Sequence, residues 1–180
     1  MKNIQGIKIR KTQVSDAEQI IKLENLVSRV AYAHMFSGEV FDNNESRTEE
    51  LIQKFKTYGL NENGGLDLVA IDGEKIVAFV AAVPLSFCEH YKELGYAELG
   101  EIYIDPDYQN LGLGKMLFNM VVKHFKELGC KMIVIGVFEE NMRARKVYEK
   151  WGCVLDTTYK KSFKKIGKEC PGVFYLKTLA

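Results

Sequence analysis

A short glycine-containing segment, Gln109-Asn110-Leu111-Gly112-Leu113-Gly114-Lys115, joins a strand-like segment to a helix-like one. Gly112 and Gly114 have no Cβ, so the backbone amides beside them can approach a ligand closely. The first N–H groups of the helix that follows have no partner within that helix, and such groups attract phosphate oxygens. The spacing therefore predicts an anion-binding turn. The alternative is a glycine-containing helix start that holds no ligand.

Two other glycine-rich phosphate loops are excluded by their spacing. A Walker A loop needs a glycine five residues before Gly114 and a Ser or Thr after the lysine, but this chain has Gln109 and Met116 there. A dinucleotide fingerprint needs a third glycine three residues after Gly114, where Leu117 stands. What remains is a Gln-x-x-Gly-x-Gly turn between a strand and a helix.

A second set of candidate residues, Asn141, Ala144, Tyr148 and Gly152, lies in one short segment. The Asn141 amide can pair with the peptide-like bonds of a ligand, or it can cap a helix. Ala144 is small enough to let a ligand pass closely. Tyr148 comes about two helical turns after Asn141, so both side chains point to one face. Its hydroxyl is a candidate proton donor, and a core aromatic ring is the alternative.

The elements that must position these residues follow from periodicity and turn signals. Asp72-Gly73 predicts a tight hairpin, Ser15 and Glu18 predict a capping box before the first helix, and residues 87–95 are predicted to form a loop or an irregular excursion. Residues 35–45 are expected to form an ordered connection. Strands are predicted at residues 7–10, 66–71, 75–83, 98–104, 131–138, 154–159 and 173–178, and helices after Ser15 and at residues 46–58, 113–128 and 141–150.

This order of elements predicts an α/β (α+β) fold with a mixed, mostly antiparallel central sheet of about seven strands, flanked by about four helices. Residues 98–138 form one strand–helix–strand unit within it. The sequence has no internal repeat and no low-complexity linker, so a single domain over residues 1–180 is predicted.

Composition excludes several classes of protein. The net charge of +1 gives no strong field toward nucleic acid. The longest apolar run, Ile76 to Leu85, is too short to span a membrane, and the N-terminus lacks the pattern of a secretion signal, so a cytoplasmic protein is expected. The cysteines have neither CxxC nor metal-site spacing, which predicts reduced, mostly buried thiols and no metal at Cys88, Cys130, Cys153 and Cys170.

The two segments together resemble the motifs of the GNAT N-acetyltransferases. Gln109 to Gly114 matches that family's coenzyme A loop, with Asp-Pro upstream and Leu117 downstream, and Asn141 to Gly152 matches its second motif, although Cys153 replaces the usual Phe. The resemblance extends over nearly the whole chain. It implies that acetyl-CoA is the co-substrate and that its acetyl group passes directly to a primary amine in a ternary complex. A non-catalytic acyl-CoA-binding module of the same fold is the alternative.

The resemblance also implies roles for individual residues. Tyr148 would be the acid that donates a proton to the departing thiolate. The base would be Glu98, which lies eleven residues before Gln109, while Glu101 and a water path remain alternatives. The residues implied to bind the cofactor are Ile102, Ile104, Gln109, Asn110, Leu111, Gly112, Leu113, Gly114, Lys115, Asn141, Ala144 and Tyr148.

The sequence leaves the acceptor open between a small amine or polyamine and a peptide amine. In the family, selectivity for the acceptor commonly comes from the first two helices and the last hairpin. Tyr32, His34, Phe36 and Phe41 could line an acceptor pocket, although a core role is preferred. A homodimer that pairs through Val173 to Thr178 is a further expectation from the family.

Overall fold

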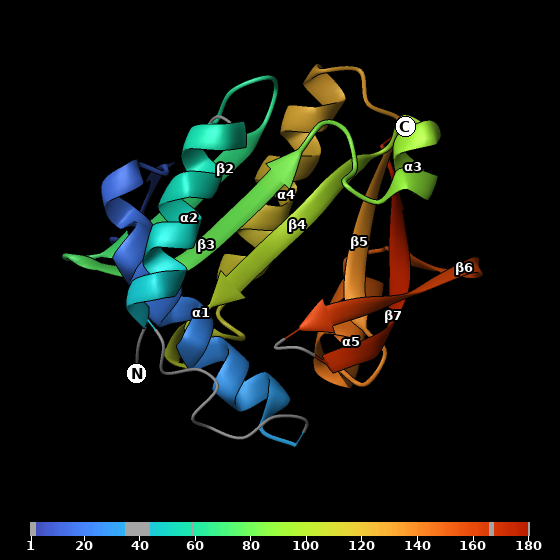
Figure 1. Cartoon of the computed structure of the whole chain (residues 1–180). Coiled ribbons are helices and arrows are strands. Elements are labelled where there is room, and N and C mark those ends of the chain that lie inside the picture. The colour runs from blue at the N-terminus through green and yellow to red at the C-terminus, as the bar shows by residue number, and fades with distance from the viewer. Residues whose placement is uncertain (1–2, 35–43, 59, 166–167, 180) are drawn as a thin grey trace. The chain divides into compact units, whose positions relative to one another are not determined.

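The computed structural model describes residues 3–34, 44–58, 60–165 and 168–179 (Figure 1). Its contacts group the chain into two compact units. The first unit contains Met1–Ala82 and Glu101–Val121, and the second contains Val83–Gly100 and Val122–Ala180. Strand β4 (Ala97–Ile104) and helix α4 (Leu113–Glu127) each contribute residues to both units.

The first unit is built on an antiparallel sheet. Strand β1 (Lys8–Lys11) pairs with β2 (Leu66–Asp72), which pairs with β3 (Lys75–Val83) through a hairpin in which Gly73 has a φ of 60°. Helices α1 (Ala17–Tyr32) and α2 (Asn44–Tyr58) lie side by side, as their blue and cyan ribbons in Figure 1 show. Their apolar faces form one core cluster with the strands, which includes Ile20, Leu51, Phe55, Val69 and Phe79.

The start of α1 differs from the prediction. A short 3-10 helix, η1 (Val14–Asp16), precedes α1, and Asp16 accepts a hydrogen bond from the Gln13 N–H (2.8 Å). Asp16 also forms a two-pronged ion pair with Arg10. The predicted capping box of Ser15 and Glu18 is therefore wrong, because the carboxylate one residue after Ser15 caps this turn and is fixed there by an arginine from β1.

The second unit contains the parallel strand pair of the sheet. Strand β4 pairs in parallel with β5 (Met132–Phe138), and β7 (Lys168–Thr178) pairs antiparallel with both β5 and β6 (Val154–Lys165). Helices α3 (Glu89–Glu93) and α5 (Met142–Lys150) belong to the same unit. Its aromatic core contains Tyr91 and Phe174, with Tyr159 and Phe163 packed against them.

The strand order β1-β2-β3-β4-β5-β7-β6 confirms the mixed, mostly antiparallel fold with seven strands. The described residues form five α-helices, one more than expected, since α3 lies within the segment predicted to be irregular. The last two strands are also longer than predicted. Because β7 lies between β5 and β6, Val173 to Thr178 is not a sheet edge, and the expected dimer contact there stays a prediction.

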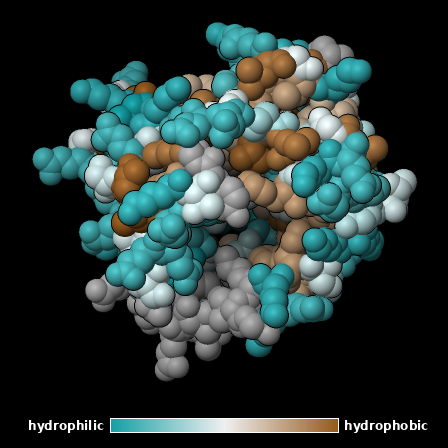
Figure 2. All heavy atoms as spheres, turned by 45° about the horizontal axis from the view of Figure 1, so that its top comes forward, coloured by the Kyte–Doolittle hydropathy of each residue, from teal (hydrophilic) through white to brown (hydrophobic). Residues whose placement is uncertain are grey.

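The surface mixes hydrophobic and hydrophilic side chains. On the face that Figure 2 displays, hydrophobic side chains form separate patches between hydrophilic ones, as is common among folded proteins. Within the described residues, no helix is both long and apolar enough to cross a membrane. Three of the four cysteines are buried and Cys130 is half-buried, all as free thiols, in agreement with the sequence.

Candidate functional site

The predicted anion-binding turn lies between β4 and α4, in the first unit. After Ile104 the chain forms a short 3-10 helix, η3 (Pro106–Tyr108), whose N-cap is the buried carboxylate of Asp105, which accepts from the Asp107 N–H (2.9 Å). The Gln109 side chain then donates from Nε2 to the Ile104 carbonyl (2.8 Å). These two bonds fix the path of the chain from the strand into the turn.

Residues of the β2–β3 hairpin bond to Asp105 and Tyr108, at the start and the end of the segment that leads into the turn. The Tyr108 hydroxyl donates to Asp72 Oδ2 (2.5 Å), at the end of β2, and the Lys75 ammonium lies 2.6 Å from Asp105 Oδ2. The Asp105 N–H also donates to the Val77 carbonyl (2.9 Å). We call these three bonds the hairpin clamp. They attach η3 on both sides, so the residues that follow it start from a fixed position.

The turn has the form of an anion cradle. Asn110 and Gly112 adopt positive φ angles of 62° and 89°, and a Cβ built on Gly112 would meet no atom within 4 Å. The Met116 N–H donates to the Gly112 carbonyl (3.0 Å), so the amides of Leu113 and Gly114 lie in the first turn of α4. Gln109 Oε1 is buried and accepts no hydrogen bond from the described residues. Open space and first-turn amides fit a diphosphate, whose oxygens accept hydrogen bonds from N–H groups.

The other residues implied for this cradle have distinct environments. Ile102, Ile104 and Leu111 are half-buried, whereas the Leu113 side chain is buried in the core, so the part of Leu113 left for a ligand is its backbone. The Lys115 ammonium lies 5.2 Å from the centre of the Phe118 ring.

The second motif lies on α5, in the second unit. Asn141 Oδ1 accepts from the Ala144 N–H (3.1 Å), so Asn141 caps the helix. This bond uses the amide oxygen, which is the capping role weighed from the sequence. Ala144 is half-buried one turn further on.

Tyr148 is 7% exposed at the end of an aromatic group. Its ring centre lies 5.9 Å from that of Trp151 and 5.9 Å from that of Tyr175. The hydroxyl of the neighbouring Tyr175 donates to Glu149 (2.8 Å) and accepts from Arg145 Nε (3.3 Å). Burial is the largest cause that raises the pKa of Tyr175, and the bond to Glu149 adds to it while Arg145 opposes it.

The two candidate base carboxylates on β4 have different partners. In the second unit, Glu98 Oε2 accepts from Ser86 Oγ (2.5 Å) and from the Phe87 N–H (2.9 Å). In the first unit, Glu101 Oε1 lies 2.8 Å from the Lys54 ammonium. Glu98 therefore anchors the connection between β3 and β4, and Glu101 is one half of an ion pair.

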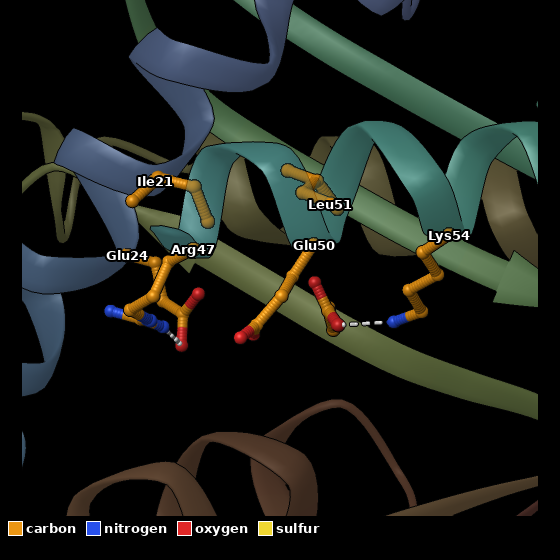
Figure 3. Close-up of a pocket in the computed structure, with 7 residues that line it drawn as sticks. Ile21, Glu24, Arg47, Glu50, Leu51 and Lys54 are labelled. Atoms are coloured by element: carbon orange, nitrogen blue, oxygen red, sulfur yellow. Dashed lines mark hydrogen bonds and ion pairs between the residues drawn. The ribbon is translucent and has the colours of Figure 1, made fainter. Parts of the chain in front are cut away.

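A pocket of about 160 Å³ lies in the first unit, between α1, α2 and β4 (Figure 3). The pocket contains two ion pairs. Arg47 Nη2 lies 2.6 Å from Glu24 Oε1, and Lys54 pairs with Glu101. Figure 3 shows the Glu50 side chain between these pairs. The lining consists of Ile21 and Glu24 from α1, Arg47, Glu50, Leu51 and Lys54 from α2, and Glu101 from β4.

Burial and the charges of nearby carboxylates together shift three pKa values in this part of the first unit. Burial lowers the pKa of Lys54, but the charges of Glu101, Glu24 and Asp67 outweigh it, so the pKa is raised. Burial and then the charges of Glu101 and Glu24 raise the pKa of Tyr103 well above its ordinary value. Burial raises the pKa of Asp67 as well, and the charge of Glu101 adds to this effect.

The predicted site residues thus divide between the units. Ile102, Ile104 and the turn at residues 109–115 belong to the first unit, and Glu98, Asn141, Ala144 and Tyr148 belong to the second. Of the residues considered for an acceptor pocket, Tyr32 is half-buried and His34 is exposed, while Phe36 and Phe41 lie outside the described residues. Sequence reasoning missed Glu24, Arg47, Glu50 and Lys54, although their spacing on amphipathic helices places charges beside the apolar stripe.

Among the described residues, no group of three potential metal ligands comes together. Comparison with known proteins gives a family for the chain. The model of the acetyltransferase (GNAT) family matches residues 30–153. The spermine/spermidine N(1)-acetyltransferase of Bacillus subtilis is 37% identical over 59 residues, which cover 32% of this chain and 39% of that protein. The chain thus matches about two fifths of the length of this relative.

Solved structures share the fold. The yncA protein of Salmonella typhimurium, solved with its cofactor acetyl-CoA, superposes with a TM-score of 0.68 at 16% identity, covering 97% of this chain and 94% of that one. The PaiA N-acetyltransferase of Thermoplasma acidophilum, solved with coenzyme A, superposes with a TM-score of 0.61 at 20% identity, covering 96% and 99%.

Proposed function

Because the chain belongs to the GNAT family of acetyltransferases, which use acetyl-CoA, we propose that it transfers the acetyl group directly to a primary amine, as one N-acetyltransferase domain. One observation carries the proposal. The turn at residues 109–115 combines an open position at Gly112 with amides in the first turn of α4. In the proposed complex these groups hold the diphosphate of the co-substrate, which supplies the activated acetyl group.

Tyr148 is proposed as the acid that protonates the departing thiolate. A tyrosine hydroxyl near pKa 10 is a weaker acid than a thiol near 8.5, so full transfer to a free thiolate would be uphill by about 2 kcal/mol. Donation as the negative charge develops is the workable route. Packing against Trp151 and Tyr175 supports this role, because it holds the ring in one orientation.

Glu98 is proposed as the group that takes the proton from the amine, directly or through water. An alkyl ammonium near pKa 10.4 costs roughly 4–5 kcal/mol to deprotonate at pH 7, so a nearby acceptor is needed. The bonds from Ser86 and Phe87 reach the same oxygen, Oε2, and orient the carboxylate. The backbone of β4 at Ile102 and Ile104 is proposed to line the bound co-substrate.

The activity is tested by incubating the protein with acetyl-CoA and a panel of amines, while release of the free thiol is measured. Turnover with at least one amine is expected. Tyr148→Phe should lower kcat about 100-fold and change the KM for acetyl-CoA by no more than about twofold. Tyr175→Phe is the matched control, since it removes another buried hydroxyl from the same aromatic group, and it should leave kcat close to that of the wild type.

The results separate two functions. Binding of acetyl-CoA without thiol release across the whole panel would indicate the non-catalytic binding module instead. Equal losses of kcat in Tyr148→Phe and Tyr175→Phe would assign Tyr148 to packing.

A further inference from the structure

Ser86 lies on the connection between β3 and β4 and is almost completely buried, with 2% of its surface exposed. Its N–H donates to the Tyr96 carbonyl (2.8 Å), so the two ends of the excursion that carries α3 are joined at its base. The Tyr91 ring of α3 is fully buried in the aromatic core and anchors the same excursion. All of these residues belong to Val83–Gly100, within the second unit. Ser86 therefore has a fixed position beside the start of β4.

The Ser86 hydroxyl is fixed in direction as well as in place. A serine hydroxyl has one proton to donate, and its oxygen can also accept. Oγ accepts from the Cys88 N–H (3.0 Å), and the hydroxyl donates to Glu98 Oε2 (2.5 Å). Bonds between a hydroxyl and a carboxylate are short and about twice as strong as bonds between neutral groups. Rotation of the hydroxyl would break this bond, so its proton stays directed at Glu98.

The donors around Glu98 make its two carboxylate oxygens unequal. The Phe87 N–H also donates to Oε2 (2.9 Å), so this oxygen accepts from both the hydroxyl and the amide. In the part of the chain that the structure describes, no donor reaches Oε1. The lone pairs of Oε1 are therefore the ones left to take a proton.

Both bonds to Oε2 can persist when Oε1 takes that proton, because Oε2 then becomes a carbonyl oxygen, which still accepts. In this step an N–H bond of the acceptor ammonium breaks and an O–H bond forms at Oε1. The electron pair of the broken bond stays on nitrogen and serves in its attack on the acetyl carbon, and the proton later passes to water. Resting on the proposed function, we infer that Ser86 is a positioning residue, whose hydroxyl holds Oε2 so that Oε1 of Glu98 receives the proton of the amine.

The experiment measures thiol release with acetyl-CoA and the amine that the wild type acetylates fastest. Ser86→Ala should lower kcat about tenfold, which corresponds to about 1.4 kcal/mol, and change the KM for acetyl-CoA by no more than about twofold. The loss is partial because the Phe87 N–H still holds Oε2. Ser86→Cys is a second variant, whose sulfur still accepts from the Cys88 N–H but donates only weakly, and its kcat should fall at least about threefold. Ser86→Thr keeps the hydroxyl and should stay within about twofold of the wild type.

Two further variants separate positioning from stability. Tyr91→Phe removes the bond from the Tyr91 hydroxyl to Asp156 (2.8 Å), so it weakens the same excursion without touching Glu98. It should lower the urea midpoint, as Ser86→Ala does, and leave kcat unchanged. Glu98→Gln should lower kcat about 100-fold. Ser86→Ala added to Glu98→Gln should change kcat by no more than about twofold, because a serine that acts only through the Glu98 carboxylate has nothing left to position.

The outcomes distinguish this inference from the proposed function. Equal kcat in Ser86→Ala and Tyr91→Phe would overturn the inference while the acetyltransferase activity stands, and so would a full tenfold loss when Ser86→Ala is added to Glu98→Gln. Wild-type kcat in Glu98→Gln would remove both Glu98 and Ser86 from the reaction. Thiol release with none of the amines would refute the proposed function and, with it, this role of Ser86.

Discussion

The hairpin clamp makes a sharp prediction for Tyr108→Phe. This change keeps the buried ring and removes the hydroxyl that donates to Asp72 (2.5 Å). A hydrogen bond to a charged group contributes about 1.5–3 kcal/mol, and because Asp72 is exposed and regains water, the loss should lie near the lower limit. If the clamp fixes the turn before it binds the diphosphate, part of this loss appears as weaker binding. Each 1.4 kcal/mol is about tenfold in affinity, so the KM for acetyl-CoA should rise between about three- and tenfold.

The chain offers a matched control for this experiment. In the second unit, the Tyr91 hydroxyl donates to Asp156 (2.8 Å), which is the same kind of bond on a fully buried ring. Urea unfolding should show a loss of stability in both Tyr108→Phe and Tyr91→Phe. Steady-state kinetics with acetyl-CoA as the varied substrate should show the rise in KM in Tyr108→Phe alone, with kcat unchanged. An equal KM in both variants would refute the idea that the clamp positions the turn.

Two further predictions follow from the backbone and from a depressed pKa. Gly112→Ala should raise the KM for acetyl-CoA at least tenfold, because the added methyl enters the cradle. It should also lower the free energy of unfolding in urea by about 1–2 kcal/mol, because φ at Gly112 is 89°. Gly129→Ala, where φ is 78°, should lower the free energy of unfolding by a similar amount and leave the KM unchanged. Burial raises the pKa of Asp156, but hydrogen bonds from Thr158 and Tyr91 outweigh it, so the pKa is lowered. The Asp156 carboxylate therefore stabilises the fold at pH values above the unfolded pKa near 3.9. This stabilisation is lost as the pH falls through the pKa of the folded state. The stability gap between wild type and Asp156→Asn should therefore be constant from about pH 5 to 8 and close below pH 3 to 4. A gap that persists at pH 2.5 would contradict this.

The turn signals gave the most accurate sequence predictions. Asp72-Gly73 predicted the β2–β3 hairpin, and the apolar repeat after Leu113 predicted α4 up to its end near Gly129. These patterns are local, since a positive φ or a helical period needs no distant partner. The residues proposed for the anion cradle could be named from the sequence for the same reason. They are consecutive in the chain, and the structure shows them as one turn.

The wrong secondary-structure predictions involve contacts between residues that are far apart in the sequence. Residues 160–165 are mostly basic and were assigned to a loop, yet they extend β6 beyond a bulge between Asp156 and Lys161. The Phe163 ring lies over Gly136 and Gly172, where added Cβ atoms would fall 2.9 Å and 2.1 Å from it. The glycines make room for this ring, and a contact between segments so far apart in the sequence gives no local signal.

The pocket was missed for a related reason. Glu24 and Arg47 come from different helices, and no periodicity indicates which helices meet. Selection of the acceptor by the first two helices is an expectation from the family resemblance and stays a prediction. The candidates Tyr32 and His34 do not line this pocket, whose lining includes charged residues of α2.

The partners of Glu98 and Glu101 bear on the choice of base, which the sequence left open. A carboxylate held by an ammonium 2.8 Å away, as Glu101 is, must weaken that ion pair when it takes a proton. Glu98 accepts from a hydroxyl and a backbone amide, which are neutral donors and can still bond to the carboxyl group after protonation. The arrangement favours Glu98 for proton transfer and Glu101 for holding a permanent positive charge. Odd spacing along β4 makes this division workable, because it directs the two side chains to opposite faces of one strand.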